Sequence, residues 1–168
     1  MRKNLLWALV AMSAALLETT LLGKISVYGV VPDLSVLAVI YFALTEGEER
    51  AMFTGVLGGL FQDIASNRVL GHNILCLVLI GYAAGKLSTR LITNHPAVKT
   101  GLVFIASLAD GLLYVGIMYV QDPGAMALSI VAGRVVPAAF YTALVTPLAF
   151  WALDKALSRY FEPQAHAA

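Results

Sequence analysis

Apolar residues run through this chain in long blocks that are separated by short polar connections. Six blocks are long enough to form helices that cross, or nearly cross, the roughly 30 Å hydrocarbon layer of a membrane. We expect these helices at residues 4–22, 34–44, 51–64, 72–88, 100–120 and 125–153. The pattern therefore predicts an all-α bundle of six transmembrane helices that forms one domain over residues 1–168.

Two blocks depart from a plain spanning helix. The second, at residues 34–44, is short, so residues 25–31 before it are expected to enter the membrane as irregular backbone or a partial helix. Lipid permits such backbone only where protein covers it. The sixth block contains Pro137 and Pro147, which predict a kink or tilt.

Composition agrees with a lipid environment. Hydrophobic residues make up 60% of the chain and charged residues only 12%, against about a quarter in soluble domains. The first block is interpreted as a retained span and not as a cleaved signal peptide, because its end has no small-x-small site. A net charge of +1 gives no field that would attract nucleic acid, so nucleic acid is not an expected partner.

Basic residues indicate how the bundle is oriented. With the N-terminus in the cytoplasm, eight of them fall on the cytoplasmic side and only Lys24 and Arg68 on the outer side. The cytoplasmic set is Arg2, Lys3, Arg50, Lys86, Arg90, Lys99, Lys155 and Arg159. Since cytoplasmic loops are enriched in Lys and Arg, both termini are expected in the cytoplasm.

Charged residues inside the spans are candidates for a site, because charge in hydrocarbon is costly. Asp110 lies about ten residues before the turn at 121–124 and Arg134 about ten after it, so both are expected roughly 15 Å below the outer surface. We expect them to form a structural ion pair between the fifth and sixth helices. The alternative is a proton or ion relay, which normally needs a longer chain of titratable groups.

Three further carboxylates, Glu18, Asp33 and Asp63, fall near the outer ends of their helices. A metal site is not expected, because no histidine shows ligand spacing to another. Asp33 follows Pro32 at an expected helix start, where its side chain is predicted to cap exposed N–H groups.

Glycines four residues apart lie on one face of two helices, Gly55 with Gly59 and Gly81 with Gly85. Small residues allow helices to approach closely in lipid. The favoured interpretation is packing inside the bundle, and the alternative is a face that receives the helix of another protein.

Several enzyme signatures are missing from the sequence. It has no nucleophile elbow, no phosphate-binding glycine loop and no HExxH helix, so neither an enzyme nor a cofactor is expected.

The order of several short motifs resembles the family of the rod shape-determining protein MreD. They are PDL at 32–34, a charged inner loop, GVLGGLFQDI at 55–64, VLG at 69–71 and a span that ends in GYAAGKL at 81–87. The resemblance implies a fold similar to the S components of energy-coupling-factor vitamin transporters, with a possible pocket open to the outer side. It places Pro32, Asp33, Gly59, Gln62 and Asp63 in or near that pocket. With Gly55 and Gly71, these residues are the expected partner-binding or pocket positions.

Membership would imply a multi-pass protein of the bacterial inner membrane that acts without catalysis in the elongation complex of the lateral wall. The implied partner is MreC, a single-span protein with a large periplasmic part. MreC would link it to MreB and to an elongation transglycosylase and transpeptidase pair, and membrane lipid is a further expected contact.

Three functional hypotheses follow. The leading one is a membrane scaffold or regulator of cell shape and lateral peptidoglycan synthesis. The alternative is a transport subunit that captures a small solute, although the first loop offers few pocket residues beyond Ser26, Tyr28 and Asp33. An intramembrane enzyme would need a carboxylate pair whose loss abolishes turnover.

Overall fold

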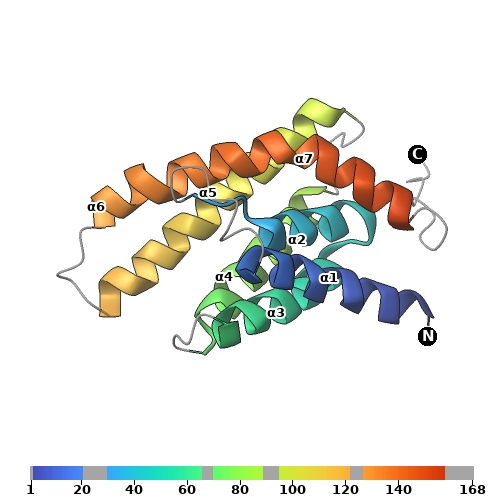
Figure 1. Ribbon diagram of the computed structural model, residues 1–168, viewed down its shortest axis with the longest axis horizontal. Helices are drawn as coiled ribbons and strands as arrows, with labels where there is room; N and C mark the ends of the chain where they lie inside the picture. The colour runs from blue at the N-terminus through green and yellow to red at the C-terminus, as the bar shows by residue number, and fades with distance from the viewer. Residues whose placement is uncertain (1, 21–29, 66–69, 89–94, 122–126, 158–168) are drawn as a thin grey trace.

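The computed structural model describes residues 2–20, 30–65, 70–88, 95–121 and 127–157, and these residues form an all-helical fold (Figure 1). The helices are α1 (Arg2–Thr20), α2 (Leu34–Thr45), α3 (Glu48–Ala65), α4 (His72–Ser88), α5 (Pro96–Gln121), α6 (Ala127–Ile130), the π-helical turn η2 (Val131–Val135) and α7 (Val136–Leu157). The last three follow one another without a break and form one helical rod. The expected all-α fold is thus confirmed, whereas residues 25–29 and 122–124 lie outside the described residues.

Two of the described helical segments are long and apolar enough to cross a membrane, namely Pro96–Gln121 and Val131–Leu157, the part of the rod that η2 and α7 form. Leu6–Thr20, Leu34–Thr45 and His72–Ser88 are apolar but shorter. At about 1.5 Å per residue, the 12 residues of α2 extend only about 18 Å. This short helix lies at the centre of the fold, since every side chain from Ser35 to Ala43 is buried.

The helices fall into two groups (Figure 1). α1, α3 and α4 pack around α2, while α5 and α7 lie side by side, and the end of α5 extends together with α6 beyond the first four helices. α2 contacts α1, α3, α4, α5 and α7, so it joins the two groups. The start of α1 and the end of α7 lie at the same end of the molecule.

α3 and α4 form the most extensive helix pair, and glycines make their contact possible. A Cβ added to Gly55 would lie 2.7 Å from the backbone of Leu77, and one added to Gly59 would lie 2.5 Å from the backbone of Ile74. A Cβ on Gly81 would lie 2.8 Å from Ala51 in the opposite direction. Glycines on both helices therefore bring two backbones into direct contact, as the favoured interpretation of their spacing predicted.

Local signals explain where the helices of this group begin. Gly47 and Gly71 have φ values of 90° and 102°, which favour glycine, and each lies next to a helix start. Glu48 and Glu49 occupy the first turn of α3, where negative charge interacts favourably with the helix dipole. α3 consequently begins three residues earlier than the apolar pattern predicted.

Candidate functional site

The N-terminus of α2 is fixed from both sides by hydrogen bonds. Oδ1 of Asp33 accepts a 2.9 Å bond from the Val36 N–H, which confirms the predicted helix cap. The Asp33 N–H donates a 2.9 Å bond to Oγ1 of Thr142 on α7. The preceding Pro32 is buried and has no N–H to satisfy. These contacts hold the Asp33 carboxyl group at the junction of α2 and α7.

Glu18 connects α1 to the N-terminus of α2. Its Oε2 accepts hydrogen bonds from the backbone N–H and the hydroxyl of Ser35, at 2.9 and 2.8 Å. Its Oε1 accepts a 2.8 Å bond from the side-chain amide of Gln62 on α3. Gln62, an expected pocket residue, therefore ties α3 to α1.

The Asp63 side chain accepts hydrogen bonds from the start of α4. It is only 1% exposed, and its carboxylate accepts bonds from the Gly71 N–H at 2.8 Å, the Asn73 N–H at 3.1 Å and the Asn73 side-chain amide at 2.9 Å. These donors include backbone groups that a helix start leaves unpaired. Asp63 and Gly71 thus form a joint between α3 and α4.

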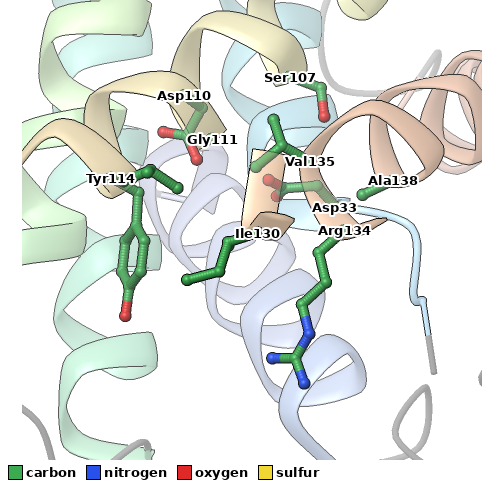
Figure 2. A pocket seen from close by; sticks show the side chains of 10 residues that line it. Asp33, Ser107, Asp110, Gly111, Tyr114, Ile130, Arg134, Val135 and Ala138 are labelled. Atoms are coloured by element: carbon green, nitrogen blue, oxygen red, sulfur yellow. The ribbon is translucent and has the colours of Figure 1, made fainter. Parts of the chain in front are cut away.

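A partly open pocket of about 210 Å³ lies where α2, α5 and the rod of η2 and α7 meet (Figure 2). Asp33 contributes one carboxyl group and Asp110, on α5, another. The rest of the lining is Ser107, Gly111, Tyr114, Val115, Ile130, Arg134, Val135 and Ala138. Of the residues expected at a pocket, Asp33 alone lines this one.

The expected ion pair between Asp110 and Arg134 is not formed. Both residues line the pocket, but no ion pair joins them among the described residues, and Oδ1 of Asp110 is buried without a hydrogen-bond partner. Figure 2 shows Arg134 extending away from both carboxyl groups, and its side chain is exposed. Arg134 lies in η2, where a π-helical turn rotates side chains away from the positions that a regular α-helix would give. The equal depth that residue counting gives for Asp110 and Arg134 is therefore not enough to bring their side chains together.

The carboxyl groups near this pocket form an acidic cluster, which we define as Glu18, Asp33 and Asp110. Asp33 and Asp110 line the same pocket, and Glu18 accepts hydrogen bonds from Ser35, two residues after Asp33. Among the described residues, no three His, Cys, Asp or Glu side chains are arranged to hold a metal ion. The cluster is thus a group of neighbouring carboxyl groups without metal-site geometry.

Gly55 and Gly59 lie away from the pocket, since both face α4. Their close contacts make them part of the bundle interior and leave no room there for the helix of another protein. The alternative interpretation, in which they form a partner's docking face, does not fit this packing.

Hydroxyl groups that the apolar pattern did not single out build much of this region. Ser35 holds Glu18, and Thr142 accepts the Asp33 N–H while donating a 2.8 Å bond to the Ala138 carbonyl. Across the bundle, the rings of His72 and Tyr114 stack with centroids 4.2 Å apart. The available signal was the presence of Ser and Thr in apolar helices, where they commonly bond between helices.

A second hollow runs along the opposite face of α5. This groove, of about 500 Å³, is lined by Ala109, Leu112, Leu113, Gly116, Ile117 and Val120. Leu112, Leu113 and Val120 are exposed. A Cβ added to Gly116 would meet nothing within 4 Å, in contrast to the glycines of α3 and α4.

Comparison with known proteins places the chain in a family. The family model described as "rod shape-determining protein MreD" matches residues 1–159 of the 168. No curated protein and no solved structure gives a significant match. The matched family is one of membrane proteins, and the two long apolar helices fit insertion into a membrane. Because the match covers nearly the whole sequence and confirms the resemblance of its motifs, this chain belongs to the MreD family of rod shape-determining proteins.

Proposed function

We propose that this protein is a non-enzymatic scaffold or regulator of the bacterial rod complex, a multi-pass protein of the inner membrane that binds MreC. Through MreC it acts with MreB and with the transglycosylase and transpeptidase pair that extends the lateral wall. Membership of a shape-determining family supports this role.

The proposed topology has six crossings and both termini in the cytoplasm. Successive helices run in alternating directions, and the start of α1 lies at the same end as the end of α7 (Figure 1). An even number of crossings produces this arrangement. The basic residues near both ends of the chain support the cytoplasmic assignment.

The proposal that MreC is a partner rests on the groove along α5. Gly116 lies inside a helix, where glycine is less favourable than alanine by about 1 kcal/mol, yet no described neighbour requires it. The surrounding side chains are apolar and uncovered by other described helices. A transmembrane helix that packs closely on another uses a small residue at the contact. We therefore assign the groove to the single membrane-spanning helix of MreC.

Copurification in mild detergent tests this assignment. Tagged wild-type protein is expected to retain MreC, and Gly116→Leu to lose most of it because the new side chain fills the groove. Gly101→Leu is the matched control: it lies on the same helix, also has open space at its Cβ position and is outside the groove. Equal MreC recovery with both variants, or none with the wild type, would refute the docking site.

Depletion in a rod-shaped bacterium tests the cellular role. Loss of the protein is expected to round the cells, and Gly116→Leu is expected to fail to restore the rod where Gly101→Leu succeeds. Normal shape accompanied by a vitamin requirement would instead support a solute-capturing transport subunit.

A further inference from the structure

The pocket between α2, α5 and the rod of η2 and α7 is lined by two carboxyl groups that form no ion pair among the described residues. Asp33 and Asp110 both line it, and Glu18 lies nearby, where it accepts hydrogen bonds from Ser35, two residues after Asp33. The Asp33 and Glu18 carboxyl groups accept hydrogen bonds, whereas Oδ1 of Asp110 is buried and accepts none among the described residues. Asp110 thus has a carboxyl oxygen at the pocket wall that could accept a hydrogen bond from a ligand.

The depth of Asp110 increases the need for a positive partner. It lies 11 residues before the end of α5, or about 16 Å along the helix axis. Ionisable side chains at such depth in a membrane protein normally pair or face a water-filled cavity. Arg134 does not supply that pairing, since its guanidinium extends away from the carboxyl groups (Figure 2).

The chemistry of the walls limits the kind of cation. A metal ion would require several converging ligands, and the described residues contain no such group. A primary ammonium needs only hydrogen-bond acceptors around three N–H groups. Two carboxyl groups meet that need, and the buried hydroxyl of Ser107 lies on the same wall.

Arg134 indicates the rest of the ligand. It lines the pocket but is exposed, which places a positive group at the rim of an interior that is lined by two carboxyl groups. A ligand that is complementary to this arrangement carries its ammonium inward and an anionic group outward. The volume of about 210 Å³ is below the range of about 300–1,000 Å³ typical of drug-sized ligands, so the bound part is small.

We propose that this pocket binds a small zwitterion in which a primary ammonium lies a few bonds from a phosphate or carboxylate, as in phosphoethanolamine. Asp110 and Asp33 receive the ammonium, and Arg134 receives the anionic group. Two sources offer this chemistry, the headgroup of phosphatidylethanolamine and a free soluble zwitterion. The inference is independent of MreC, because the groove for MreC lies on the opposite face of α5.

Two binding measurements on the purified full-length protein separate the sources. In the first, O-phosphoethanolamine is added to delipidated protein in detergent while thermal unfolding is recorded. In the second, the protein is placed in nanodiscs that contain phosphatidylethanolamine and phosphatidylcholine in equal amounts, and retained lipid is identified by native mass spectrometry. Selective retention of phosphatidylethanolamine identifies the lipid headgroup, whereas a raised unfolding midpoint without such retention identifies a free zwitterion.

Variants connect either signal to the pocket. Asp110→Asn is expected to weaken binding at least about tenfold, because it removes the charge that receives the ammonium. Arg134→Gln, at an exposed position, is expected to keep the fold and to weaken phosphoethanolamine but not ethanolamine. Glu49→Gln removes an exposed acid outside the pocket and is expected to bind like the wild type. If Asp110→Asn does not fold, Arg134→Gln alone decides. No binding in either measurement, or equal binding by wild type and Arg134→Gln, overturns the proposal.

Discussion

Replacing Gly59 by alanine tests the direct backbone contact between α3 and α4. The added Cβ would lie 2.5 Å from the Cα and N atoms of Ile74 and 2.8 Å from the carbonyl carbon of Asn73. All three are backbone atoms, so no side-chain rotation relieves the overlap. The helices must separate by about 1 Å to reach ordinary van der Waals distance.

The size of the effect follows from three contributions. Overpacking in a tight interior costs about 1–3 kcal/mol. Separation of the helices also strains the bond between Asp63 and the Asn73 N–H, one turn further along, at up to about 1 kcal/mol. Alanine is favoured over glycine in a helix by about 1 kcal/mol, which offsets part of this. The net expected loss is up to about 3 kcal/mol, or up to about 12 °C in unfolding temperature for a chain of this size, and because the gain from alanine is common to both, Gly59→Ala is expected to be about 1–4 kcal/mol less stable than an alanine variant in open space.

The matched control is Gly116→Ala, the same chemical change in open space. It is expected to leave the unfolding temperature unchanged or to raise it. Cys76, the single cysteine, is 1% exposed on α4, so its labelling by a thiol-reactive dye during heating reports unfolding of purified protein. Equal unfolding temperatures for the two alanine variants would show that the contact between α3 and α4 is not as close as the structure has it.

Three further changes probe other joints, each measured by the same thermal unfolding. Asp63→Ala is expected to cost about 2–3 kcal/mol, because it leaves three part-buried donors of Gly71 and Asn73 without their acceptor, whereas a loss below about 1 kcal/mol would contradict the cap. Gly71→Ala is expected to cost about 1–2 kcal/mol, because φ is 102° there, and an unchanged midpoint would argue against that conformation. Trp7→Phe removes the 2.8 Å bond from the indole N–H to Oγ1 of Thr54 and is expected to cost about 1 kcal/mol, with no additional loss in a background that already carries Thr54→Val.

Helix positions were largely predictable, because blocks of apolar residues and turn residues mark them. α4 begins and ends where expected, since Gly71 and the polar turn before it define the start. α5 begins four residues earlier than the apolar pattern indicated, at Pro96, a residue favoured in the first turn of a helix. The pattern reports where the apolar part of a helix lies, whereas the helix itself continues into polar sequence.

The candidate site was only partly predictable. Asp33 as a cap follows from local sequence, because its partner is three residues away. The relation of Asp110 to Arg134 depends on the direction of side chains across two helices, and residue counting gives depth alone. Glycine spacing likewise identified the packing faces of α3 and α4 but not which helix each face meets.

The C-terminal end of α5 and the N-terminal end of the helical rod extend past the other helices (Figure 1). A force applied to those ends would reach the other helices through contacts that include the Asp33–Thr142 hydrogen bond and the stacked rings of His72 and Tyr114. α3 and α4, which pack backbone to backbone, are expected to keep their relative position under such a load.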